Sequence, residues 1–327
     1  MADNCIIKLL RSKWGQLIGW QICSILICGS GTMCTYIARN FEMTIPLLML
    51  SMTYFIIFLF SCWRIPKTDV PKWRYFVISL GLIAGDYTAV TAFNTTSLAS
   101  AMVFVTTVIF WVCPFAYFFF GRKVSLIQFF AIILSLSGGA LVFVADGTEG
   151  SRWLGNVLAL VSSFSYAVTN IFQEWTIHSG SMHAYLFFFS LGAFPVALAL
   201  SGITEWKIIR DYQWCTKSIV LTISYAFILA FFNIASSFVM QYSDATTMNI
   251  SMLTSNFFSL AISIIFFDQK ASWLYLVGFC CIPIAIVIFS LFGPKENVLP
   301  DEVSKSLLSE NAWASMTDAT DDRTDTK

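Results

Sequence analysis

An acid stands alone in one of the most apolar stretches of the chain. Asp86 lies in the segment YFVISLGLIAGDYTAVTAF, which holds no other charged residue. An ion at the middle of a bilayer costs at least about 2.5–3.5 kcal/mol, so a carboxyl in such a segment suggests a function by default. It can bind and release a proton, or hold a cation or a cationic substrate. The alternative interpretation is an acid near the membrane interface that is bonded to hydroxyl groups.

Polar residues recur at four-residue spacing in a second apolar segment. They are Ser162, Tyr166, Asn170 and Glu174. Residues four apart lie on nearly the same face of a helix, so the spacing predicts a polar stripe that ends in a carboxylate. Facing lipid, this stripe would be unfavourable, because hydrocarbon offers no hydrogen bonds. We expect it to line a substrate path, and hydrogen bonding between helices is the alternative.

A third apolar segment, residues 245–267, carries a row of hydroxyl groups. The row winds slowly around a helix, because each four-residue step drifts by about 40°, and this favours packing against a crossing helix. Asn249, Thr254 and Asn256 are better candidates for a lining, since amides recognise ligands and add little to packing. Together, the residues expected along a substrate or ion path are Asp86, Tyr87, Asn94, Tyr166, Asn170, Glu174, Asn249, Thr254 and Asn256.

The sequence lacks the motifs of enzymes and metal proteins. It contains no nucleophile elbow, phosphate-binding loop or zinc-protease motif. His178 and His183 lie in one short predicted loop, and the nine cysteines lie mostly in apolar runs without metal-ligand spacing. We therefore expect no enzyme activity, no cofactor and no metal site.

The composition indicates which elements must position these residues. The chain is 57% hydrophobic and only 12% charged, whereas a soluble domain has about 25% charged residues. A water-soluble core could not bury this much apolar surface, so lipid is the expected solvent. The formal net charge is zero, which gives no indication of a nucleic-acid partner.

Apolar segments long enough to cross a bilayer follow one another along the chain. Each approaches the roughly 20 residues that a transmembrane helix needs. Pro114, Pro195 and Pro283 interrupt three of them and are candidate bends. We expect an all-α membrane protein with about ten transmembrane helices, at residues 15–36, 43–62, 73–93, 98–120, 125–145, 153–173, 184–202, 217–238, 245–267 and 272–292.

A short sequence pattern occurs twice in the chain. When residues 121–125 are laid over residues 268–272, Lys123 falls on Lys270 and Ser125 on Ser272. Each copy ends an apolar helix, makes a charged turn and opens a new helix at a serine. We expect two inverted five-helix repeats, as in many secondary transporters. The predicted division is a tail 1–14, a repeat 15–145, a loop 146–152, a repeat 153–292 and a disordered tail 293–327.

The distribution of Lys and Arg predicts the orientation. Basic residues of the first half gather on the side of the N-terminus, and the second half alone leans the other way. The first helices usually dominate, so both termini are expected in the cytosol. A plasma membrane and an internal membrane fit this pattern equally well.

These residues resemble the F-type branch of solute carrier family 35, in the drug/metabolite transporter superfamily, over roughly residues 15–292. The most specific matches are residues 243–279, with the run ATTMNISMLT, residues 155–174, with YAVTN, and Asp86-Tyr87 leading to residues 95–98. The resemblance implies ten helices, two inverted repeats and solute transport by alternating access. The chain departs from the family pattern at Asp86, Thr91 and Val105, where members tend to have an Asn, a Lys and an acid.

We expect a transporter of a small organic solute in the lipid bilayer, with a proton or a cation as the candidate coupling ion. No Lys or Arg lies deep in a predicted span, and a nucleotide-sugar exchanger needs basic groups for its phosphates. A neutral or cationic solute, nucleoside-like or vitamin-like, is therefore favoured over a sugar nucleotide. The alternatives are a nucleotide-sugar exchanger, a membrane scaffold or accessory subunit that transports nothing, and a membrane-embedded enzyme.

Overall fold

The structure of the chain is a computed structural model. It describes residues 10, 12–63, 65–96, 101–102, 104–105, 107–122, 125–146, 153–267 and 273–292. Contacts divide the chain into two units, Met1–Pro294 and Lys295–Lys327, and the second lies outside the described residues. The predicted tail 293–327 therefore has no structural description here.

Helices are the regular elements of the described residues, as the apolar composition predicts. Their order is α2 (Lys13–Phe41), α3 (Pro46–Ser61), α4 (Lys72–Thr95), α6 (Val108–Phe120), α7 (Leu126–Asp146), α8 (Trp153–Ser179), α9 (Met182–Thr204), α10 (Trp206–Asp211), α11 (Thr216–Met240), α12 (Ala245–Met252), α13 (Ser255–Phe267) and α14 (Trp273–Leu291).

Five of these helices are long and apolar enough to cross a membrane. They correspond to α2, α4, α8, α9 and α11, and shorter apolar helices occur at Pro46–Ser61, Val108–Phe120 and Leu126–Gly138. Large apolar side chains face outward, including Phe118, which is 80% exposed, and Ile265, which is 70% exposed. Serine, threonine and amide side chains are buried instead. This distribution suits a lipid solvent, in which buried polar groups must bond one another.

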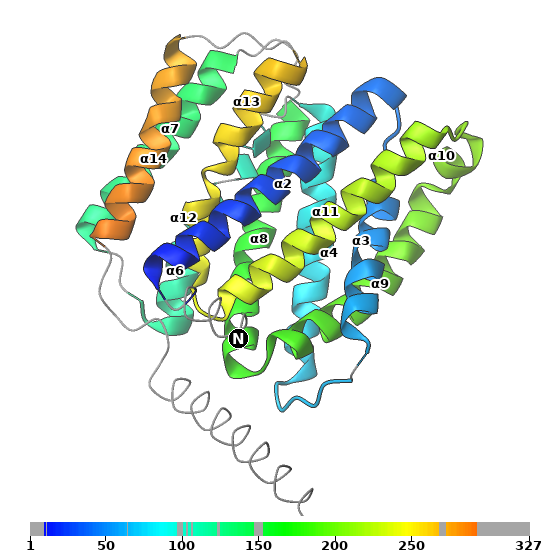
Figure 1. Cartoon of the computed structure of the whole chain (residues 1–327), viewed down its shortest axis with the longest axis horizontal. Coiled ribbons are helices and arrows are strands. Elements are labelled where there is room, and N and C mark those ends of the chain that lie inside the picture. Colours follow the sequence, from blue (N-terminus) through cyan, green and yellow to red (C-terminus); the bar gives the residue numbers. More distant parts are fainter. Residues whose placement is uncertain are drawn as a thin grey trace, which may run out of the picture. The chain divides into compact units, whose positions relative to one another are not determined.

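Two of the predicted spans are interrupted. The segment 245–267 forms α12 and α13, which are separated by Leu253 and Thr254 (Figure 1). The segment 98–120 becomes α6 only after Thr107, which lies in a turn. The candidate bends at Pro114 and Pro195 do not interrupt the assigned helices, because α6 and α9 continue through them.

Local side-chain bonds account for several helix ends. Ser125 opens α7 as predicted: its hydroxyl accepts from the Gln128 backbone N–H at 3.2 Å, and the side-chain Oε1 of Gln128 accepts from the Ser125 backbone N–H at 3.0 Å. Gly121 ends α6 with φ +66°, a left-handed conformation that glycine adopts without strain. Lys123, Lys270 and Ser272, which carry the sequence repeat, lie outside the described residues.

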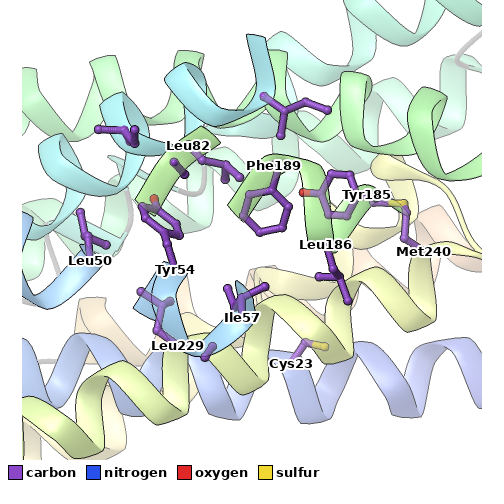
Figure 2. Packing of buried hydrophobic residues seen from close by; sticks show 14 of the residues in the cluster. Cys23, Leu50, Tyr54, Ile57, Leu82, Tyr185, Leu186, Phe189, Leu229 and Met240 are labelled. Atoms are coloured by element: carbon purple, nitrogen blue, oxygen red, sulfur yellow. The ribbon is translucent and has the colours of Figure 1, made fainter. Parts of the chain in front are cut away.

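Helices from distant parts of the sequence form the main pairs. α4 packs on α8, α3 on α9 and α2 on α11, while α7 packs on α14 beside the others (Figure 1). A buried cluster joins the first three pairs; Tyr54, Leu82 and Phe189 lie in it, from α3, α4 and α9 (Figure 2). The acid and the polar stripe predicted from the sequence therefore lie on neighbouring helices, α4 and α8.

Candidate functional site

Asp86 lies buried between two tyrosines. Its side chain belongs to α4, and the residue is 7% exposed. The Tyr54 hydroxyl of α3 donates to Oδ2 at 2.6 Å, and the Tyr166 hydroxyl of α8 donates to Oδ1 at 2.6 Å. Among the described residues, no basic side chain forms an ion pair with Asp86. Two neutral donors of the described part of the chain therefore hold the carboxylate.

Glycines place Asp86 next to Tyr166. Gly81 and Gly85 face α8, where a Cβ atom on Gly85 would stand 2.9 Å from the ring of Tyr166. A Cβ on Gly81 would collide with Thr169. The two helices therefore approach closely here, as helices with a Gly-x-x-x-Gly spacing commonly do. The approach lets the Tyr166 hydroxyl reach Asp86 one residue further along α4.

Tyr54 is held rigidly on the other side of Asp86. The side chain is fully buried, and its ring meets Phe189 edge-on with the centroids 6.3 Å apart. Figure 2 shows the ring among Leu50, Leu82 and Phe189. Such packing leaves the hydroxyl few orientations, so the bond to Asp86 requires little further ordering.

A cavity of about 100 Å³ opens beside Asp86. It lies between α4, α8, α11 and α12, and residues near the interruptions at Thr107 and Thr254 complete its wall. A volume of this size holds several water molecules. The described residues that line it include no Lys or Arg and comprise Ile27, Leu82, Asp86, Met102, Val105, Val108, Tyr166, Asn170, Gln173, Phe232, Asn233, Ser236, Met248, Asn249, Met252 and Ser255.

Amides bridge the wall of this cavity. The Asn170 side-chain N–H₂ donates to Oδ1 of Asn249 at 3.1 Å, and the Asn249 N–H₂ donates to the carbonyl of Ala245 at 2.7 Å. Gln173 donates to the hydroxyl of Ser237 at 3.4 Å. The arrangement joins α8 to α12 through neutral donors and acceptors, which a bound solute can replace with bonds of its own.

Glu174 lies outside the cavity wall. It is fully buried, its Oε1 is 2.5 Å from the Arg122 guanidinium, and its Oε2 accepts from the Ala245 N–H at 2.9 Å. Asp244 caps the same helix start by accepting from the Thr247 N–H at 2.8 Å. Glu174 therefore ties the end of α8 to the turn after α6 and to the start of α12.

The other predicted path residues are spread over the bundle. Tyr87 is 38% exposed, and Asn94 accepts a weak bond from the Cys34 thiol at 3.4 Å. Thr254 donates to Gln21 and contacts Ser24, both in α2, and Asn256 is buried. None of these four belongs to the described cavity wall. Of the nine candidates, the structure brings Asp86, Tyr166, Asn170 and Asn249 together at the cavity.

Several residues of the site had no local signal in the sequence. Tyr54 reads as an ordinary aromatic of an apolar helix, and Gln173 falls outside the four-residue stripe. The sequence repeat could have indicated Asn233, because the shift that lays Lys123 on Lys270 also lays Asp86 on Asn233. Both line the cavity.

A third buried acid fixes a helix start away from the cavity. The Glu205 carboxylate accepts from the N–H groups of Leu47 and Leu48 at 2.8 and 2.9 Å, and from the Ser201 hydroxyl at 3.0 Å. These N–H groups belong to the first turn of α3, where the helix itself offers no carbonyl to accept from them. Burial raises the pKa of Glu205, although each of the three hydrogen bonds favours the ionised form.

One solved crystal structure of a protein has the same fold over most of its length. It superposes with a TM-score of 0.65 at 12% sequence identity, covering 86% of this chain and 98% of that one. At this identity the likeness concerns the fold alone.

Sequence comparison finds relatives among solute carriers. The chain is 24% identical to solute carrier family 35 member F2 of Mus musculus, over 87% of this chain and 80% of the relative. It is 24% identical to the same member of Xenopus tropicalis, over 82% and 74%. The family model for the F type of solute carrier family 35 matches residues 10–291. With its apolar helices and buried polar groups, the chain is an integral membrane protein that belongs to the F-type branch of solute carrier family 35.

Proposed function

We propose that the protein is a secondary transporter that carries a small organic solute, neutral or cationic, by alternating access. One observation carries the proposal: a cavity inside the bundle whose described wall combines Asp86 with amides and hydroxyls and contains no basic residue. Such a wall offers donors and acceptors in fixed positions together with apolar surface, as ligand sites do. Membership of a solute carrier family supports the same reading.

The charges of the wall favour the class of solute. Phosphates are held in proteins by Arg, Lys or helix starts. Arg122 is engaged by Glu174 outside the described wall. Asp86 attracts positive charge, and its carboxylate, which two tyrosine hydroxyls hold in place, can bind and release a proton or a cation. A neutral or cationic solute therefore fits better than a sugar nucleotide.

The size of the cavity implies movement. About 100 Å³ holds several waters, and an organic solute needs more room. The Asn170–Asn249 bond crosses between α8 and α12 and must open for a solute to bind both amides. Alternating access requires such a movement, because the wall must open toward one side of the membrane while it closes toward the other.

The proposed architecture has ten spans in two five-helix units of opposite orientation, with both termini in the cytosol. The repeated segment of the sequence supports the two units, and the bias of Lys and Arg supports the orientation. A protease site placed after Lys327 tests the orientation. It should be cut only after the membrane is opened, and cutting on the external face of intact cells would overturn this part.

The test of transport begins with an unbiased metabolite comparison of cells with and without the protein, which names candidate solutes. Uptake of each candidate is then measured in liposomes that contain the purified protein. We expect concentrative uptake, and Asp86→Asn should reduce it at least tenfold, or remove its pH dependence, while the amount of folded protein stays normal. Asp86→Glu should retain part of the activity.

Two results would contradict the proposal. If no candidate enters liposomes although the protein is folded, a scaffold or accessory role becomes the better reading. If Asp86→Asn transports at an unaltered rate and pH profile, Asp86 has no part in the mechanism, and the amides of α8 and α12 remain as the site. Tyr87→Phe is the matched control, because this neighbour is exposed outside the described wall and should transport normally.

A further inference from the structure

Two threonines stand at the two interruptions of the predicted spans. Thr107 precedes α6, and Thr254 lies between α12 and α13. The shift that lays Lys123 on Lys270 also lays Thr107 on Thr254. The repeat was recognised from the charged turns alone, so the coincidence of the two interruptions is an independent observation.

Both threonines bond the carbonyl of the residue three positions before them. The Thr107 N–H donates to the carbonyl of Phe104 at 3.2 Å, and the Thr254 N–H donates to that of Ser251 at 3.3 Å. The hydroxyls lie 2.6 and 2.8 Å from these same carbonyls, and the Thr254 hydroxyl has a further partner, Oε1 of Gln21, at 2.7 Å. Phe104 and Ser251 are themselves related by the shift. Each threonine thus satisfies a carbonyl that the interruption removes from the regular helical pattern, and in lipid such groups need a partner.

Each threonine also reaches a helix of the other half of the chain. The Thr107 hydroxyl lies 3.1 Å from that of Ser163 in α8, and the Thr254 hydroxyl lies 3.1 Å from that of Ser24 in α2. α2 and α8 are the first helices of the two proposed units. The contact made by the first unit on the second is therefore repeated by the second unit on the first.

The residues around both threonines form matching parts of the cavity wall. Three positions around each interruption line the cavity, two before the threonine and one after it. The shift pairs them one to one: Met102 with Asn249, Val105 with Met252 and Val108 with Ser255. The wall of the first unit is apolar at these places, and that of the second is partly polar. A movement at either threonine therefore displaces groups that face the cavity.

We propose that Thr107 and Thr254 are matched positioning residues for transport, each holding the interruption of its span against the first helix of the opposite unit. Through these contacts they set the cavity wall and its access from the two sides of the membrane. The inference rests on the proposed function. In the proposed architecture the two units are inverted, so the symmetry that relates Thr107 to Thr254 also exchanges the two sides of the membrane. Loss of one hydroxyl should therefore act on access in the opposite sense to loss of the other.

A hydroxyl bonded within its own helix does not create such an interruption. Thr91 donates to the carbonyl of Tyr87 at 2.7 Å, and α4 continues through it without a break. Thr91→Val is therefore the matched control for Thr107→Val and Thr254→Val, since each change replaces a hydroxyl by a methyl group of nearly the same size.

The experiment measures access to the cavity and needs no solute. Met102→Cys places a thiol in the wall, and a membrane-impermeant maleimide is added to one side or the other of liposomes that contain the full-length protein. Labelling of protein without the added cysteine is subtracted. We expect Thr107→Val and Thr254→Val to change the ratio of labelling from the two sides at least fivefold, in opposite directions. Thr91→Val should leave the ratio unchanged.

Further variants separate positioning from a general loss of structure. Thr107→Ser and Thr254→Ser keep the hydroxyl and should label like the parent protein, whereas Ser163→Ala and Ser24→Ala should each reproduce the valine change at the partner threonine. Shifts in the same direction, or no shift beyond that of Thr91→Val, would overturn the inference. If valine variants do not fold, the alanine variants decide by the same criterion. Opposite shifts without uptake of any solute would support the inference and contradict the proposed transport.

Discussion

Two buried acids of this bundle have opposite surroundings. Asp86 accepts from two tyrosine hydroxyls at the cavity wall, while Glu174 pairs with the Arg122 guanidinium and a helix N–H outside that wall. A cation compensates the charge of Glu174, and this carboxylate joins three segments. Neutral donors compensate Asp86 only in part. From this difference we infer that Glu174 serves the structure and that Asp86 is the better candidate for exchange with a solute or a proton.

The largest expected effect tests the structural acid. Arg122→Gln leaves the Glu174 charge buried without its cation, and a broken buried pair costs about 3–5 kcal/mol. We expect a marked loss of thermal stability in detergent, and Arg122→Gln with Glu174→Gln should recover most of it. Arg210→Gln is the control, because its pair with Asp211 is exposed and should contribute little. Equal stability of the single and double variants would show that the pair is not what holds these segments.

A smaller effect is expected at the tyrosines that hold Asp86, the acid proposed to exchange a proton or a cation. Tyr166→Phe and Tyr54→Phe each remove one donor from Asp86, and a hydrogen bond to a charged group contributes about 1.5–3 kcal/mol. We expect uptake to fall roughly tenfold, since 1.4 kcal/mol is a factor of about ten. Tyr185→Phe is the control, because its hydroxyl is not one of the two that donate to Asp86. Normal uptake by both variants would remove the distinction between the two acids.

The smallest effect concerns the approach of α4 to α8. Gly85→Ala places a methyl group against the Tyr166 ring, which must move away from Asp86. Overpacking costs about 1–3 kcal/mol, and the better helix propensity of alanine returns up to about 1 kcal/mol. We expect little change in melting temperature and a several-fold loss of uptake. Gly202→Ala, where the added group meets open space, should leave both measurements unchanged. Loss of stability without loss of uptake would argue that this approach serves packing alone.

The helical class could be predicted, because it follows from apolar length, and Asp86 could be singled out as a candidate, because a charge in lipid is costly. The stripe on α8 was predicted only in part. Four-residue steps drift by about 40°, so Glu174 has turned by about 80° from Tyr166, whereas Gln173, seven residues on, has turned back by only about 20°. This rotation places Gln173 in the wall and turns Glu174 toward Arg122.

The partners of the acids could not be read from local patterns. Tyr54 and Arg122 meet Asp86 and Glu174 only through the packing of separate helices, and neither has a sequence environment that marks it. The interruptions at Thr107 and Thr254 were also missed, because hydrophobicity continues through them. The shift that relates the charged turns also pairs Thr107 with Thr254, so the sequence repeat extends to the two interruptions.

The crosswise pairing of the helices has a consequence for synthesis. The N–H groups in the first turn of α3 have no acceptor until Glu205 is synthesised. Asp86 lacks one of its two donors until the ribosome adds Tyr166, 80 residues later. The early helices therefore enter the bilayer with polar groups that their own half of the chain satisfies only in part. A nascent chain released before α8 would lack both partners and expose these groups to lipid, and cellular quality control can recognise such exposed polar groups as the mark of an unfinished protein.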